Sequence, residues 1–325
     1  MNAGAVVGFG RGELDADLAA FARDVGPDGP VCVVGGRTQW DVGGLPAPGC
    51  REVTAPAGVV SHQPEEMVVR VRAGTTVAAL DAAVASAGQM VVLDPAAADR
   101  ATVGGVLAVG RSGVRRLRYG PIRDSVLEVR FVSAEGRLVK AGGPVVKNVT
   151  GYDLCKLLVG SLGTLGLLAE VVLRCYPVPA AHTWFAAVEA DPFDLYRRLF
   201  RPSAVLWDGR SVWVLLEGHP ADVADQAAGT LGPAFTEAAG PPPLPSGPRL
   251  SVPPGELARS AAALPVGWIA EVGVGTVHTA GPAAGTDEAP RLDGGPPDRR
   301  TGELHAAVKA RFDPTGRLNP GRTVL

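Results

Sequence analysis

The sequence has only four cysteines among its 325 residues, and they lie far apart at Cys32, Cys50, Cys155 and Cys175. Zinc and iron-sulfur sites usually require cysteines at the close CxxC spacing, which does not occur in the sequence. We therefore expect no metal site built from cysteines, and four reduced thiols that are mostly buried.

The chain also lacks a strong net charge and a long apolar run. Its formal charge of -2 gives no global electrostatic reason to bind nucleic acid or an anionic membrane. The most apolar long stretch, 157–173, is interrupted by Ser161, Thr164 and Glu170 and is shorter than the ~20 residues that span a bilayer. Residues 1–14 show no basic segment followed by an apolar one, so no export signal is expected. These features predict a cytoplasmic protein, held at the inner face of a membrane only if partners bring it there.

Glycine and proline are abundant, with 43 and 29 residues, and this abundance indicates many turns and irregular connections. At ~150 residues per domain, the length predicts about two domains. Pro177 and Pro179 cannot continue a central strand, so we place a domain boundary near residue 178.

The first half alternates strands and helices. Helical spacing of apolar residues predicts a helix over 15–25, and an apolar stripe after Thr75 or Thr76 predicts a second helix that ends at Gly88. Asp153 could cap a third short helix. Strands are expected at 31–34, 67–72, 90–93, 126–133, 137–141 and 165–176, with a hairpin turn at 135–136.

The second half predicts a small α+β unit. Strands are expected at 183–188, 204–207 and 211–217, and helices at 193–200 and 221–231. Two proline-rich segments, 240–254 and 281–297, lack the apolar residues that form a core, and we expect the second to be a surface loop or disordered.

The strand at 31–34 stops abruptly at a double-glycine turn, Gly35-Gly36-Arg37-Thr38-Gln39. Glycines let main-chain N–H groups approach an anion closely, and the Thr and Arg side chains add donors, so the turn could bind a phosphate. Taken alone, it could equally be a tight turn that only ends a strand.

A second cluster of small residues and hydroxyls begins at Thr102-Val103-Gly104-Gly105 and continues through Ser112-Gly113 and Tyr119-Gly120 to Arg123-Asp124. Two such turns could grip one diphosphate. Arginines surround the second cluster at positions 111, 115, 116, 118 and 123, where they could bind phosphates or a carboxylate substrate, or simply form a solvated basic loop.

Over residues 31–178 the order and spacing of these segments resemble the FAD-binding fold of the vanillyl-alcohol oxidase and D-lactate dehydrogenase superfamily. The signatures are the two glycine clusters, the run Lys147-Asn148-Val149-Thr150-Gly151-Tyr152-Asp153-Leu154 and the segment Gly160-Ser161-Leu162-Gly163-Thr164-Leu165-Gly166. Within it, the chain is most similar to the small, E-type FAD-binding subunits of bacterial glycolate oxidases, which the C-terminal Leu318-Asn319-Pro320-Gly321-Arg322 also resembles.

The resemblance implies an α+β fold with α/β-like elements: a bipartite PCMH-type FAD-binding domain over 1–178, then a reduced α+β cap or substrate domain over 179–325 that carries the Pro/Gly-rich loop near 281–297. FAD is expected to be non-covalent, since no histidine lies in the first glycine turn. The implied FAD-binding residues are Gly35, Gly36, Arg37, Thr38, Gln39, Asp94, Thr102, Gly104, Gly105, Ser112, Gly113, Tyr119, Gly120, Arg123, Asp124, Gly163, Thr164, Gly166 and Leu167.

Full-length relatives of the D-lactate dehydrogenase type carry two histidines around Gly-Asp-Gly-Asn. The corresponding stretch here runs from Glu271 to His278 with Gly-Val-Gly-Thr between, so only one of the two histidines remains. His278 could act as a catalytic base or be a packed structural residue. No metal ligand set is expected. Lys147 could lie near the negative charge that develops on reduced flavin, or could only solubilise a loop. The Tyr152-Asp153 pair could line the flavin, or simply cap the helix that follows.

The resemblance implies that the chain works with a larger flavoprotein subunit and an iron-sulfur subunit to oxidise glycolate or a related 2-hydroxy acid. One alternative is a self-sufficient FAD-dependent D-lactate or glycolate dehydrogenase that uses His278 and the arginine cluster. A further alternative is an assembly scaffold that has lost its cofactor.

Overall fold

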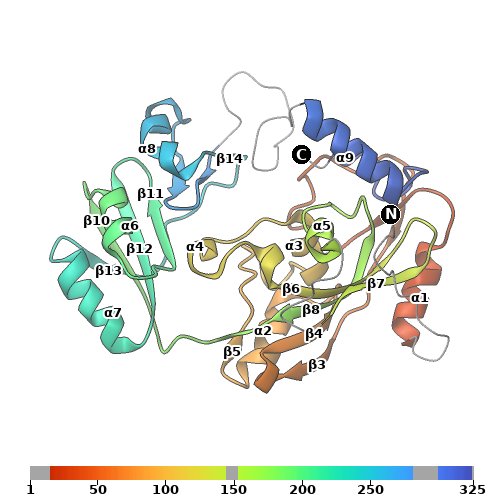
Figure 1. The fold of residues 1–325 in the computed structure, drawn as a ribbon, viewed down its shortest axis with the longest axis horizontal. Helices are drawn as coiled ribbons and strands as arrows, with labels where there is room; N and C mark the ends of the chain where they lie inside the picture. Colours follow the sequence, from red (N-terminus) through yellow and green to blue (C-terminus); the bar gives the residue numbers. More distant parts are fainter. Residues whose placement is uncertain (1–14, 144–152, 281–298, 324–325) are drawn as a thin grey trace. The chain divides into compact units, whose positions relative to one another are not determined.

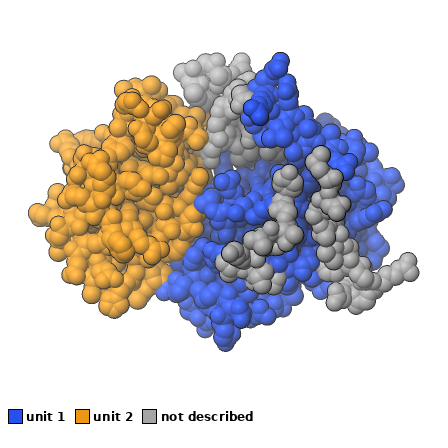
Figure 2. Space-filling model, viewed as in Figure 1, with its two compact units in different colours: residues 1–113, 121–178, 297–324 blue, residues 114–120, 179–296, 325 orange. Residues whose placement is uncertain are grey.

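The computed structural model describes residues 15–143, 153–280 and 299–323, which form two compact units. Unit 1 comprises residues up to Gly113, Pro121–Val178 and the C-terminal part from Pro297 to Val324, and unit 2 comprises Val114–Gly120 and Pro179–Pro296 (Figure 2). None of the helices in the described ranges combines the length and hydropathy needed to cross a bilayer.

Unit 1 is built around a five-stranded antiparallel sheet with the order β3-β4-β8-β6-β7 (Figure 1). The strands are Val59–Gln63 (β3), Val68–Arg72 (β4), Leu167–Arg174 (β8), Val126–Val132 (β6) and Leu138–Gly142 (β7). The long apolar strand expected near residue 170 is confirmed as β8, the central strand, which explains why it is apolar over nearly its whole length.

The two faces of this sheet differ in chemistry. Because side chains alternate along a strand, Val69 and Val71 of β4 enter the apolar core while Arg70 points to the opposite face. There Arg70 makes ion pairs of 2.8 Å with both Glu128 and Glu170. These two carboxylates are buried, and burying a charge is tolerated only when it is paired.

Helices and two small strand pairs complete unit 1. Helix α2 begins after Thr76, whose hydroxyl accepts from the Ala79 N–H and so confirms the expected cap. Asp153 caps α5 in the same way. The remaining elements are the helices Ala16–Val25 (α1), Val77–Ala85 (α2), Val103–Val109 (α3), Leu154–Leu158 (α5) and Arg299–Phe312 (α9), and the pairs Val31–Val33 (β1) with Arg51–Val53 (β2) and Gln89–Met90 (β5) with Tyr176–Pro177 (β9).

Unit 2 contains a seven-stranded antiparallel sheet with the order β13-β10-β12-β11-β15-β16-β14. The strands are Thr236–Ala238 (β13), Ala181–Val188 (β10), Ser211–Gly218 (β12), Ala204–Trp207 (β11), Ile269–Glu271 (β15), Thr276–His278 (β16) and Arg249–Ser251 (β14), and the helices are Arg116–Tyr119 (α4), Pro192–Arg198 (α6), Pro220–Gln226 (α7) and Leu257–Ser260 (α8). Val212, Val214 and Leu216 of β12 belong to one core cluster and Leu215 to another, so both faces of the sheet are packed.

Several expectations need correction. The stretch after Thr102 was expected to be a glycine-rich loop, but it forms α3, which Thr102 caps. The strand expected at 90–93 is only the two residues of β5. The proline-rich segment 240–254 contains the short strand β14, and the second such segment, 281–297, lies outside the described residues.

The sequence predicted two continuous domains divided near residue 178, and the two units of the structure differ from that division. Residues 114–120 belong to unit 2, and the C-terminal segment returns to unit 1. The physical reason for this return is pairing with β1: the Val31 N–H donates to the Arg317 carbonyl at 2.9 Å and the Asn319 N–H to the Val31 carbonyl at 2.8 Å.

The mixed helical and β composition confirms the expected α+β class. The four cysteines are free, with three buried and Cys50 partly exposed, as the sequence predicted.

Candidate functional site

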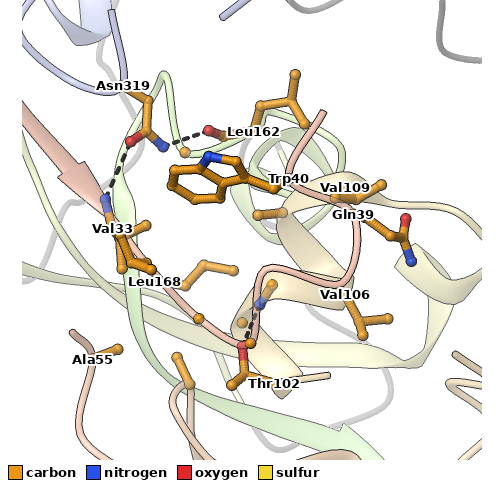
Figure 3. Close-up of a pocket in the computed structure, with 18 of the residues that line it drawn as sticks. Val33, Gln39, Trp40, Ala55, Thr102, Val106, Val109, Leu162, Leu168 and Asn319 are labelled. Atoms are coloured by element: carbon orange, nitrogen blue, oxygen red, sulfur yellow. Dashed lines mark hydrogen bonds between the residues drawn. The ribbon is translucent and has the colours of Figure 1, made fainter. Parts of the chain in front are cut away.

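A pocket of about 830 Å³, including the part open to solvent, lies within unit 1. Three segments supply most of the lining, residues 33–40, 102–109 and 161–168, and the C-terminal residues Asn319 and Arg322 complete it (Figure 3). The lining is rich in glycine and aliphatic side chains, so a ligand can approach the main chain closely.

The first glycine turn offers main-chain donors to this pocket. In the described ranges, the N–H groups of Gly35, Gly36, Arg37 and Thr38 donate to no other protein group. Their neighbour Val34 donates to the Val53 carbonyl at 2.8 Å, so the unbonded run begins where β1 ends. Successive unbonded N–H groups in a turn bind anions, and a cofactor diphosphate is such an anion.

The second glycine cluster is engaged within the protein. The Val103 N–H donates to the Thr75 carbonyl at 2.8 Å, the Gly104 N–H to the Ala73 carbonyl at 2.7 Å, and the Gly105 N–H to the Thr102 hydroxyl at 3.2 Å. These three donors are therefore not available to a ligand. The second cluster forms a wall of the pocket, and the first turn is the part that can receive an anion.

Glycine is required in the first turn for packing as well as for ligand approach. A Cβ atom on Gly35 would collide with the Thr102 side chain, and one on Gly36 would collide with the Arg100 carbonyl. Close contact between the two glycine segments thus depends on the missing side chains.

Asn319 joins two walls of the pocket (Figure 3). Its amide nitrogen donates to the Leu162 carbonyl at 2.6 Å, and its amide oxygen accepts from the Val33 N–H at 3.2 Å. The side chain is 3% exposed, so these hydrogen bonds form in a low-dielectric interior. The sequence flagged the Leu318–Arg322 motif as family-like but assigned no site role to Asn319.

The structure places ten of the residues proposed from the sequence in this lining. They are Gly35, Gly36, Arg37, Thr38, Gln39, Thr102, Gly104, Gly105, Gly163 and Gly166. Lining residues that the sequence reasoning did not select include Trp40, Gly74, Leu162, Asn319 and Arg322.

The other proposed residues lie elsewhere. Gly113 packs against Asp94, Ser112 accepts from the Ile122 N–H, Thr164 donates to the Ser161 carbonyl, and Leu167 is core. Arg123 and Asp124 form a short 3-10 turn, and Tyr119 and Gly120 belong to unit 2. Lys147 and Tyr152 fall outside the described residues.

The pocket's chemistry suits a dinucleotide such as FAD. The unbonded N–H groups of the first turn match a diphosphate, and the apolar walls match aromatic rings. In addition, the side-chain oxygen of Gln39 is buried without a donor in the described part of the chain. A buried acceptor of this kind is stabilised when a ligand donates to it.

His278 lies in unit 2, on β16. Its Nε2 atom is 2.8 Å from the Glu271 carboxylate, and the two side chains are only 2% and 3% exposed. This pair spans the β15–β16 hairpin at the position where the D-lactate dehydrogenase-like relatives carry two histidines. Its burial favours a structural role for His278. No group of three or more potential metal ligands occurs among the described histidine, cysteine, aspartate and glutamate residues.

A second histidine pair in unit 2 has a different geometry. The Nδ1 atom of His182 is 2.8 Å from the Glu217 carboxylate, which is buried, while the His182 side chain is 50% exposed. Tyr119 donates to the other Glu217 oxygen at 3.1 Å, and Arg115 lies 3.6 Å from the carboxylate. This arrangement orients the imidazole of a half-exposed side chain.

Neighbouring groups and burial set the ionisation states of Glu217 and Tyr119. Burial raises the pKa of Glu217, but neighbouring donors and cations, among them His182 and Arg115, lower it below its ordinary value. Burial, followed by the Glu217 charge, raises the pKa of Tyr119 to about 12. Glu217 is therefore ionised and Tyr119 protonated at neutral pH. Sequence reasoning missed His182, since only the pairing of β10 with β12 brings it opposite Glu217.

Comparison with known proteins identifies an FAD-binding domain in the chain. Residues 15–142 match a family model described as an FAD binding domain. That span includes the first glycine turn and the second glycine cluster, and so two of the three lining segments.

Similar curated proteins are oxidoreductases or their subunits. The chain is 35% identical over 179 residues to glycolate oxidase subunit GlcE of Escherichia coli K12, a match that covers 53% of this chain and 51% of that protein. It is 37% identical over 149 residues to a D-lactate dehydrogenase of Archaeoglobus fulgidus, covering 46% of this chain and 33% of that one. The matched region thus spans about half of the first relative and a third of the second.

The fold also resembles that of a solved structure. A structure of alkyldihydroxyacetonephosphate synthase superposes with a TM-score of 0.52 at 17% identity, covering 65% of this chain and 49% of that one. At this identity the likeness concerns the fold alone.

Proposed function

We propose that the chain is the FAD-binding subunit of a complex that oxidises glycolate or a related 2-hydroxy acid, because it carries an FAD-binding domain and is 35% identical over 179 residues to a glycolate oxidase subunit. The observation that carries the proposal is the run of four pocket-lining residues, 35–38, whose main-chain N–H groups donate to no other group in the described ranges.

The chain's own groups would act mainly by binding and orienting. The N–H groups of the first turn would hold the diphosphate, the walls around Val106 and Leu168 would exclude water, and the Asn319 bridge would fix the distance between walls. FAD, when bound, can accept a hydride from the carbon that bears the substrate hydroxyl.

We infer that catalysis requires partner subunits, namely a larger flavoprotein and an iron-sulfur protein. The similarity to a glycolate oxidase subunit and the burial of His278 against Glu271 support this inference. A buried, paired histidine cannot easily reach a substrate hydroxyl, as a general base must.

The alternative is a self-sufficient dehydrogenase. The His182–Glu217 pair is the observation that favours it, since an ionised, buried carboxylate beside a half-exposed imidazole is the arrangement of an oriented base.

Dye reduction separates these two functions. The chain is purified alone and together with its partner subunits, FAD is added, and glycolate-dependent reduction of an artificial electron acceptor is followed. The subunit function predicts turnover by the complex and none by the isolated chain. Strong turnover by the isolated chain would establish the self-sufficient dehydrogenase instead.

A further inference from the structure

Two arginines meet on one aromatic side chain in the pocket of unit 1. The guanidinium carbon of Arg37 lies 4.9 Å from the centre of the Trp40 ring, and that of Arg322 lies 4.4 Å from it. All three residues line the pocket, and Figure 3 shows the Trp40 indole lying across it. Arg37 belongs to the first glycine turn, Trp40 directly follows that turn, and Arg322 comes from the C-terminal segment.

The charge of Arg37 is already balanced. Its guanidinium donates to both oxygens of Glu52 at 2.7 Å, and its side chain is 50% exposed. An exposed, carboxylate-paired arginine has little net charge to offer to a ligand in the pocket.

The charge of Arg322 is not balanced in this way. Its guanidinium donates to the carbonyls of Val42 at 3.1 Å and Trp40 at 2.9 Å, which fix its orientation but carry no full negative charge. Among the described residues, no carboxylate lies within ion-pair distance of it. Burial lowers the pKa of Arg322, and the charges of Cys32 and Asp41 act against that effect from a greater distance.

A partly buried cation without a carboxylate partner is stabilised by an anion that enters its surroundings. A guanidinium has five N–H donors, of which two are used in the hydrogen bonds to Val42 and Trp40. The Trp40 carbonyl that accepts from Arg322 directly follows the turn whose N–H groups at residues 35–38 donate to no other group in the described ranges. Arg322 is therefore hydrogen-bonded to the segment that carries these N–H groups, and all of these residues line the pocket.

We propose that Arg322 is the cation that pairs with the FAD diphosphate, and that the C-terminal segment thereby completes the cofactor site. The proposal rests on FAD binding by unit 1 and is independent of the substrate and of the partner subunits. It assigns Arg37, which precedes Trp40 in the turn, to the Glu52 ion pair.

The C-terminal segment is held in place by the protein alone. The Ala47 N–H donates to the Pro320 carbonyl at 2.7 Å, and the Thr323 N–H donates to the Gly43 carbonyl at 2.8 Å. Arg322 is thus positioned between two anchored residues, and the site pays little ordering entropy when the anion binds.

FAD affinity of the purified full chain tests the proposal, measured by quenching of flavin fluorescence at low and high salt. Arg322→Gln should weaken FAD binding roughly 10- to 100-fold, as expected for loss of a charge-assisted hydrogen bond, and should flatten its salt dependence. Arg322→Lys should restore part of the affinity. Arg137→Gln, at an exposed arginine of unit 1 that does not line the pocket, is the control and should change it less than about 3-fold.

Competition by ADP, which contains the diphosphate but no isoalloxazine, locates the contact. Arg322→Gln should weaken ADP binding by the same factor as FAD binding. The proposal would be overturned if Arg322→Gln bound FAD and ADP as tightly as the parent, or if Arg137→Gln lost as much affinity as Arg322→Gln. A parent chain that binds no FAD would instead refute the cofactor site itself, which is a distinct result. Circular dichroism checks that each variant is folded. If Arg322→Gln is not folded, the FAD affinity of Arg322→Lys is compared with that of the parent instead.

Discussion

At the scale of single residues, the two histidines of unit 2 show what the sequence could and could not predict. The sequence pointed to His278 through its place in a motif and left open whether it is a base or a packed residue. The pairing of His182 with Glu217 depends on the register of β10 against β12, which no local pattern specifies. A motif can locate one residue, but only the sheet reveals which side chains meet.

Substitution of His278 tests its structural role. His278→Ala leaves the Glu271 carboxylate buried without its partner, so the free energy of unfolding should fall by roughly 3–5 kcal/mol. Urea denaturation measures this change. His182→Ala, at a half-exposed position, is the control and should cost no more than about 1 kcal/mol. An equal effect of both changes would contradict the assignment.

Substitution of His182 tests whether this chain supplies the general base or only binds FAD. If the chain is an FAD-binding subunit, His182→Ala should leave glycolate oxidation by the assembled complex within about 2-fold of the parent. A general base contributes typically 10²- to 10⁴-fold, so a fall of that size in kcat with FAD retained would favour the self-sufficient dehydrogenase.

At the scale of elements, most helices and strands of unit 1 were predictable because each shows a clear period and a recognisable cap or turn. Helix α3 was not. Gly104 and Gly105 each lower helix propensity by about 1 kcal/mol, so the sequence indicates a loop. Tertiary hydrogen bonds from Val103 and Gly104 to Thr75 and Ala73 stabilise the helix start instead. The first glycine turn was found because glycine after a β-branched run has a direct physical meaning.

The two glycine segments should respond differently to substitution. Gly36→Ala places a Cβ against the Arg100 carbonyl, so it should disturb the turn and weaken FAD binding at least ~10-fold, as measured by flavin fluorescence.

Thr102→Val removes only the cap of α3 and should lower the free energy of unfolding by about 1 kcal/mol. The FAD affinity of the folded variant should stay within about 3-fold, because the N–H groups of this cluster already donate within the protein. A larger loss of affinity would mean that the second cluster binds the cofactor directly.

At the scale of the whole molecule, the boundary near residue 178 follows from two prolines, but the return of the C-terminal segment to unit 1 depends on pairing over almost the full chain length. Such a long-range contact leaves no local pattern in the sequence. The same return brings Asn319 and Arg322 to the pocket, which is why sequence reasoning left them out of the cofactor site.

Buried thiols should make the folded protein sensitive to alkali. Burial raises the pKa of Cys155 to about 12 and that of Cys175 to about 11. In the unfolded chain these thiols ionise near pH 8.5, so their contribution to stability is present below that pH and is lost as the pH rises toward 11 or 12. Between pH 8 and pH 10 the free energy of unfolding should fall by about 2 kcal/mol per thiol. Cys155→Ala should reduce this slope, and an unchanged slope would contradict the argument.

The central claim is that unit 1 holds FAD by the main-chain donors of its first glycine turn. Isothermal titration calorimetry of FAD into the purified chain tests this most directly. The account predicts a yellow protein that takes up one FAD per chain, with ADP competing for the site. A folded but colourless chain that releases no heat with FAD would contradict it.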